Sequence, residues 1–135
     1  MPIPELAVLA QGEQPDATRW ILSAGGTRDD YYTFIKTVYA DGQSDEGGFG
    51  GSALYPDSLI NTYTGIGTRG LCRVLARADP RVQRLRVERA GGQKLILTPV
   101  AHVADVALVF FAALLPRETV VTAVIGLGVH GEELR

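Results

Sequence analysis

Apolar and polar residues alternate along much of this chain, with glycines and prolines between the alternating runs. Short runs of this kind, rich in β-branched and aromatic residues, are typical of β-strands. In the first third of the chain the pattern predicts strands over 5–10, 18–24 and 31–39. Further along it predicts strands over 59–64, 71–76, 82–89, 95–98, 106–113 and 119–127.

Two stretches also fit the spacing of an amphipathic helix. The apolar positions in 71–78 and in 102–115 recur at helical as well as at strand intervals. The pairs Phe110-Phe111 and Val120-Val121 favour strands, because aromatic and β-branched residues pack well on a pleated sheet. We therefore expect strands in both stretches and keep the helix as the alternative.

Strands separated by turns at this spacing predict an all-β fold, a β-sandwich of about seven strands. The length of 135 residues fits a single domain over residues 1–135. The side chains expected to fill its core are Trp20, Phe34, Leu85, Val87, Phe110 and Val124.

The composition bears on where the protein is found and what it is not attracted to, but it does not indicate a function. The net charge of −2 gives no general attraction to nucleic acid or to a membrane surface. The most apolar stretch, 103–115, is too short to span a bilayer. The single cysteine, Cys72, cannot form an internal disulfide, and its apolar neighbours predict a buried side chain. Because the N-terminus lacks signal-peptide features, we expect a cytoplasmic protein, with an excised extracellular domain as the alternative.

The second half of the chain carries a weak family pattern. It reads DPRVQRLRVERAGGQ over 79–93, LVFFAALLP over 108–116 and VVTAVIGLGVHGEEL over 120–134. This order of strands, glycine turns and an aromatic strand ending in proline resembles the uncharacterised immunoglobulin-like β-sandwich domains of actinobacteria. The resemblance implies a bacterial origin and a fold, but no activity. The disulfide pair of antibody domains is absent here, so the likeness concerns architecture alone.

A glycine- and acid-rich stretch over 41–52 predicts a long exposed loop after the third strand. Phe49 lies between two glycine pairs there, so no local constraint directs its ring into the core. We expect a protein-binding site in this region, with aromatic anchors and an acidic rim, because aromatic residues carry much of the energy of interfaces. The alternative is that Phe49 closes one end of the sandwich. The residues expected in the site are Phe49, Tyr55, Asp45 and Glu46.

The sharpest short motif is G-x-G-x-x-G, formed by Gly65, Gly67 and Gly70. In a dinucleotide-binding fold these glycines bring the backbone close to a pyrophosphate at a helix N-terminus. The segment 61–64 before the motif is polar, whereas the strand that precedes such a loop is apolar. A glycine-rich connection is therefore the preferred interpretation, and an α/β nucleotide-binding domain with a Rossmann-like half is the alternative.

No other group of residues predicts a catalytic, metal or cofactor site. The acidic run 41–47 lacks the spacing and the closing glutamate of a calcium loop, and His102 and His130 belong to no ligand cluster. Arginines between 69 and 89 are expected to form a solvated outer face, with Arg84 and Arg86 side by side. We therefore expect a non-catalytic domain that binds an unknown protein partner or associates with itself. A purely structural, oligomerising subunit is a further alternative.

Overall fold

The computed structural model describes residues 5–134 and is an all-β structure. Its only helical element is one short 3-10 turn, η1 (Ala104–Val106), within the described residues. The all-β prediction is confirmed, and the helices that the α/β alternative requires are not found in 5–134. The stretches 71–78 and 102–115, which left a helix open, form strands and that single turn. No helix in this part of the chain is long and apolar enough to cross a membrane.

The chain divides into two compact units, and each is described by itself. The first ends at Ala53 and the second begins at Leu54. No linker in the sequence marks this boundary, and the single domain over 1–135 stays a prediction.

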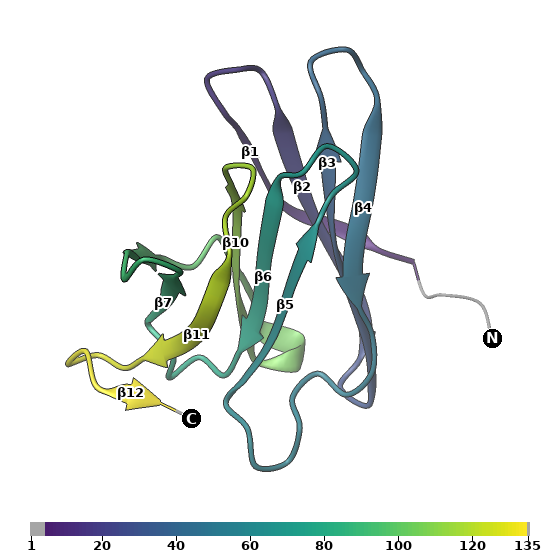
Figure 1. Ribbon diagram of the computed structural model, residues 1–135. Coiled ribbons are helices and arrows are strands. Elements are labelled where there is room, and N and C mark those ends of the chain that lie inside the picture. The colour runs from purple at the N-terminus through teal and green to yellow at the C-terminus, as the bar shows by residue number, and fades with distance from the viewer. Residues whose placement is uncertain (1–4, 135) are drawn as a thin grey trace. The chain divides into compact units, whose positions relative to one another are not determined.

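The first unit is one antiparallel sheet whose four strands lie in chain order (Figure 1). Each strand pairs with the next through a tight connection, so every pairing here is local in sequence. A bulge interrupts β1 between Val8 and Ala10. The strands are β1 (Ala7–Glu13), β2 (Arg19–Thr27), β3 (Asp30–Val38) and β4 (Ser44–Phe49).

Strand β4 corrects the predicted loop over 41–52. Residues 44–49 pair with β3 in continuous register, although glycine is a poor strand former. A Cβ atom on Gly48 would collide with the Thr33 carbonyl and the Phe34 ring, and one on Gly50, just beyond the strand, with the Tyr32 ring. Because Gly48 and Gly50 have no side chains, they leave room for the rings of Tyr32 and Phe34 on β3. These two rings lie nearly parallel, with their centroids 6.4 Å apart.

Burial along β3 also corrects the predicted core. Tyr31, Thr33, Ile35 and Thr37 are buried, whereas Phe34 on the opposite face is only partly buried. Phe34 shares its face with Lys36, which is exposed, so the inward face of β3 is the opposite one. Trp20 is likewise only partly buried.

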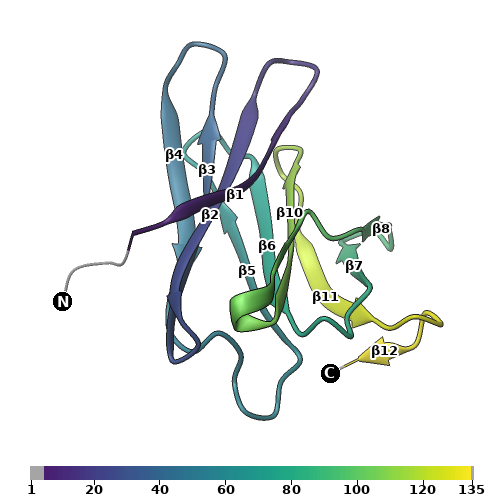
Figure 2. The ribbon, with the colours of Figure 1, turned by 180° about the vertical axis from the view of Figure 1, so that it is seen from behind.

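The second unit contains two antiparallel four-stranded sheets, seen from opposite sides in Figures 1 and 2. One sheet has the order β5 (Ile60–Ile66), β6 (Cys72–Ala78), β10 (Leu108–Leu115) and β9 (Ala101–Val103). The other has the order β12 (Glu133–Leu134), β11 (Val121–Leu127), β7 (Arg84–Arg89) and β8 (Lys94–Leu97).

Apolar side chains from both sheets form the core of the second unit. Leu85 and Val87 of β7 are completely buried there, as predicted, and Val124 packs against them while remaining partly exposed. Phe110 is also completely buried, as predicted. The core cluster comprises Cys72, Val74, Ala76, Ala78, Val82, Leu85, Val87, Val109, Phe111 and Leu115.

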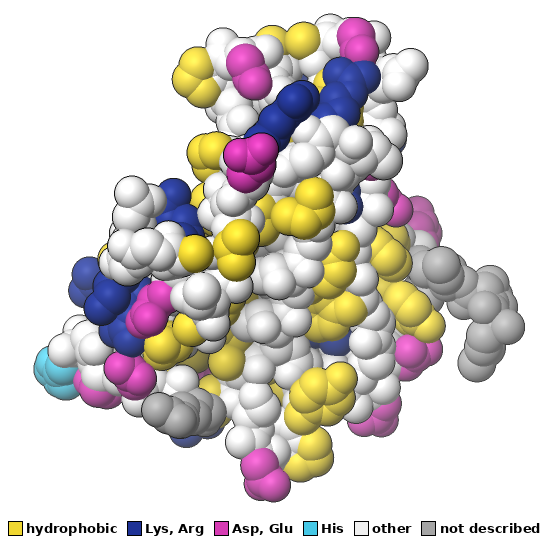
Figure 3. Space-filling model, in the orientation of Figure 1, with side chains coloured by type: hydrophobic (Ala, Val, Ile, Leu, Met, Phe, Trp, Pro, Cys, Tyr) yellow, Lys and Arg dark blue, Asp and Glu magenta, His cyan; other side chains and the backbone are white. Residues whose placement is uncertain are grey.

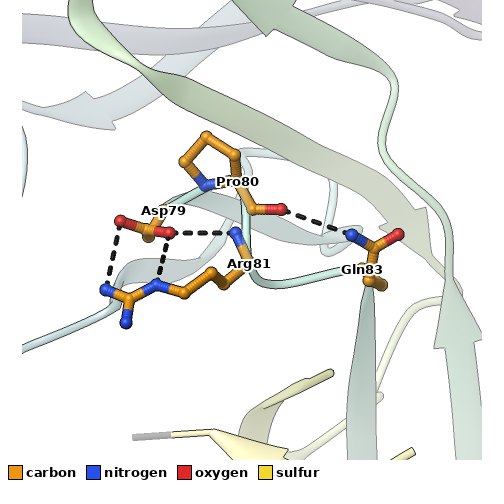
Figure 4. Close-up of polar contacts among 4 residues, drawn as sticks. All are labelled: Asp79, Pro80, Arg81 and Gln83. Atoms are coloured by element: carbon orange, nitrogen blue, oxygen red, sulfur yellow. Dashed lines mark hydrogen bonds and ion pairs between the residues drawn. The ribbon is translucent and has the colours of Figure 1, made fainter. Parts of the chain in front are cut away.

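A tight turn carries the chain from β6 in one sheet to β7 in the other (Figure 4). Asp79 accepts hydrogen bonds from the Arg81 backbone N–H and the Arg81 Nε, both at 2.9 Å. The hydrogen bonds and charge of Asp79 raise the pKa of the Arg81 guanidinium. Gln83 Nε2 donates to the Pro80 carbonyl at 3.4 Å.

Candidate interaction site

The predicted binding residues come from strand β4 and, for Tyr55, from the second unit. Phe49 is the last residue of β4, opposite Thr33, and is partly exposed. Asp45 shares its face of the strand, whereas Glu46 points to the other face and lies opposite Lys36. The Asp45 carboxylate accepts a hydrogen bond from the Tyr39 hydroxyl at 2.7 Å. Tyr55 is 60% exposed and belongs to the second unit, so a surface shared with Phe49 stays a prediction.

The G-x-G-x-x-G motif forms a hairpin connection between β5 and β6. Gly65 lies within β5, and Gly67 and Gly70 build the turn, in which Gly67 N–H bonds to the Leu71 carbonyl at 3.0 Å. Gly70 has a φ of +86°, which favours glycine. A strand follows the motif where a dinucleotide site needs a helix N-terminus, so the structure gives the glycines a turn-forming role.

The arginine-rich stretch divides between buried and exposed positions. Arg84 and Arg86 share the outer face of β7, as predicted. Arg73 and Arg77 on β6 are buried, so the prediction of a solvated face is wrong for these two arginines. Arg86 forms ion pairs with Glu88 at 2.8 Å and with Glu133 at 2.9 Å. Hydrogen bonds from the guanidinium to these carboxylates raise the pKa of Arg86.

The remaining reactive side chains gather into no site. Cys72 is buried, as predicted, and desolvation raises the pKa of its thiol despite the nearby Arg73. His102 and His130 are exposed and lie in different segments. Among residues 5–134, no group of three or more metal-ligating side chains is close enough to hold an ion.

The feature that stands out is an open sheet edge. An edge strand exposes unpaired backbone groups, and proteins usually protect such edges with charges, bulges, short strands or cover. Strand β1 has its bulge, β4 has Asp45 and Glu46, and β8 has Lys94. Strands β9 and β12 have only three and two residues. Among the edge strands that the structure describes, seven-residue β5 alone has no charge, proline or bulge.

The register of β5 shows which of its backbone groups are open. Leu59 and Gly67, at its two ends, bond to Asp79 and Leu71 opposite them, so the odd-numbered residues face β6. In an antiparallel pair the alternate residues point their N–H and C=O groups away from the partner. The even-numbered residues of β5 therefore direct these groups to the free edge.

One serine hydroxyl covers the first of these positions. Ser58 Oγ donates to the Ile60 carbonyl at 2.7 Å and accepts from the Ile60 N–H at 3.3 Å. The backbone groups of Thr62, Thr64 and Ile66 pair with no other strand in the described part of the chain. These three residues are exposed, and Ile66 is 60% exposed.

Two grooves flank this edge on the side of β11. One, of about 250 Å³, is lined by Thr64, Ile66, Cys72, Val120 and neighbouring residues. The other, of about 520 Å³, lies between Ser58 and Ile60 on one side and Val124, Ile125 and Leu134 on the other. Figure 3 shows hydrophobic side chains reaching the surface beside β5 and over β11. The edge thus combines open backbone groups with two grooves that are partly apolar, the larger of which is also lined by Asp57 and Glu133.

Sequence reasoning missed Ser58, Thr62, Thr64 and Ile66. The available signal was a strand candidate without charge or proline, but its place at an edge follows from sheet order alone. The chain matches no protein-family model, no curated protein and no solved structure.

Proposed function

We propose that this protein is a non-catalytic interaction domain that binds an extended polypeptide strand along β5. The unprotected edge of β5 is the observation that carries the proposal. The proposal includes an immunoglobulin-like arrangement of the sheets and a cytoplasmic setting, as the sequence led us to expect. It replaces the predicted loop around Phe49 with a sheet edge as the main binding surface.

The addition of a strand would use both the open backbone groups of β5 and the two grooves beside it. Main-chain hydrogen bonds to an added strand supply affinity, and pockets for alternate side chains supply specificity. Thr62, Thr64 and Ile66 offer the hydrogen bonds, and the two grooves offer room for apolar side chains. The expected ligand is an uncharged extended segment that carries some apolar side chains for the grooves.

A proline at the edge tests the proposal without breaking the sheet. In Thr64→Pro the lost N–H faces away from β6, so the β5–β6 ladder is retained. The matched control, Thr64→Val, keeps the N–H and nearly the same side-chain volume. Random nonapeptides displayed on phage would be selected against the wild-type protein and then measured on both variants.

We expect selected peptides to be uncharged, to bind the wild type and Thr64→Val equally, and to lose at least about tenfold in affinity for Thr64→Pro. Peptides that bind Thr64→Pro as tightly as the wild type would place binding elsewhere and overturn the proposal. Failure to select any peptide, together with a monomeric protein, would also overturn it.

A further inference from the structure

We infer that the strand added to β5 is β5 of a second copy of this chain, running antiparallel and centred on Thr64. This inference rests on the proposed function and names its partner. A two-fold axis at Thr64 would place Thr64 opposite Thr64 of the second copy, and Thr62 opposite Ile66 of the second copy. The result is a closed, isologous dimer with one continuous sheet.

The hydrogen-bonding state of the edge selects this register. Ser58 already satisfies Ile60, which leaves Thr62, Thr64 and Ile66 as the open positions. This set is symmetric about Thr64. A two-fold axis there gives every open N–H and C=O a partner and leaves the Ser58 hydrogen bonds intact.

The absence of charge on β5 fits pairing with itself. An antiparallel two-fold contact brings residues at and beside the axis close to their own copies, so like charges there would repel each other. From Ile60 to Ile66 no side chain carries a charge. The edge strand β4, with Asp45 and Glu46, is a counterexample within the same chain, because its self-pairing would bring acids together.

Side-chain shape also fits the pairing. In this register Tyr63 lies opposite Gly65 of the second copy, so the two Tyr63 rings do not face each other across the pair. Within one chain the Tyr63 phenol already lies against Gly65. On the other face, Ile66 and the nearby Val120 are 60% and 59% exposed and line the same groove. A second strand at this edge would cover Ile66.

Sedimentation velocity over a range of protein concentrations is the first test. We expect the wild type and Thr64→Val to dimerise, and Thr64→Pro and Thr64→Lys to need at least about tenfold more protein for the same dimer fraction. Circular dichroism would verify that both variants remain folded. A wild type that stays monomeric, or a Thr64→Pro variant that dimerises equally, overturns the inference.

Disulfide cross-linking tests the register. Thr64→Cys should form a disulfide with its own copy under mild oxidation, because the Cα atoms of such a pair lie about 5.5 Å apart. In Thr62→Cys the two positions would be about 13 Å apart, four residues along the strand, and should not cross-link. The native Cys72 is buried and gives a low background. A mixed disulfide between Thr62→Cys and Thr64→Cys chains in place of the Thr64 homodimer would overturn the register.

The two proposals can fail separately. Peptides that bind the wild type but not Thr64→Pro, on a protein that stays monomeric, would leave the proposed function standing and remove self-pairing. Peptide binding that ignores Thr64→Pro would overturn the proposed function itself.

Discussion

Strands β4 and β5 follow one another along the chain, and each lies at the edge of a four-stranded sheet. Their edges differ in charge. β4 carries Asp45 and Glu46 and pairs with β3, whereas β5 has only uncharged residues, with isoleucine at both ends. Charge on an edge discourages a further strand from adding. The comparison indicates that one edge is protected and the other is available for pairing.

Glycine also has different roles in the two strands. On β4, a Cβ atom at Gly48 would meet the Thr33 carbonyl, a backbone atom of the neighbouring strand. On β5, a Cβ atom at Gly65 would meet the phenol of Tyr63, the end of a movable side chain. The first glycine is required by the packing of its sheet, whereas the second leaves space that a rotation of Tyr63 could also provide.

The largest expected effect separates the two sides of β5. Tyr63 directs its N–H to β6, and Thr64 directs its N–H to the free edge. Tyr63→Pro removes a ladder hydrogen bond and should lower the free energy of unfolding by about 3 kcal/mol or more, whereas Thr64→Pro should change it by less than about 1 kcal/mol. Urea unfolding at a concentration where the protein is monomeric measures both. Equal losses would mean that the Thr64 N–H is needed within the chain.

A smaller effect tests the glycines. Gly48→Ala should cost about 1–3 kcal/mol of stability, because the Thr33 backbone must shift to admit the methyl group. Gly65→Ala should cost less than about 1 kcal/mol, because Tyr63 can turn aside and alanine suits a strand better than glycine. Thermal unfolding of the two variants gives the comparison. A larger loss for Gly65→Ala would show that Tyr63 is fixed in place.

The same two strands show how far the sequence predicts the fold. A strand was predicted over 59–64 and found over 60–66, because isoleucine, threonine and tyrosine favour strands. β4 was missed, because glycines and acids are poor strand formers and its stability comes from pairing with β3 and from the rings on Gly48 and Gly50. Phe34 was placed on the wrong face for a related reason, since hydrophobicity alone does not show which face of β3 is buried.

The candidate site could not be predicted in the same way. The sequence shows that 60–66 has no charge, but an open edge exists only because β6 pairs with β5 on one side and with β10 on the other. The β5–β6 hairpin is local, but the pairing of β6 with β10 joins segments about 30 residues apart, and local patterns do not encode it. Phe49, Asp45 and Glu46 were instead chosen as an aromatic anchor and an acidic rim in a predicted loop, and they proved to lie on a strand.

The smallest expected effect concerns Ser58, the one protective device of β5. Its hydroxyl satisfies both backbone groups of Ile60, so Ser58→Ala should cost about 0.5–1.5 kcal/mol of stability. In hydrogen exchange at a concentration where the protein is monomeric, the Ile60 amide should then exchange as fast as those of Thr62 and Thr64, while the amides of Asn61 and Tyr63 stay protected by β6. Ser58→Thr keeps the hydroxyl and should exchange as the wild type does. Because the Thr64-centred dimer does not use Ile60, Ser58→Ala should leave dimerisation unchanged. A stronger dimer would show instead that Ile60 joins the added strand once its hydroxyl partner is gone.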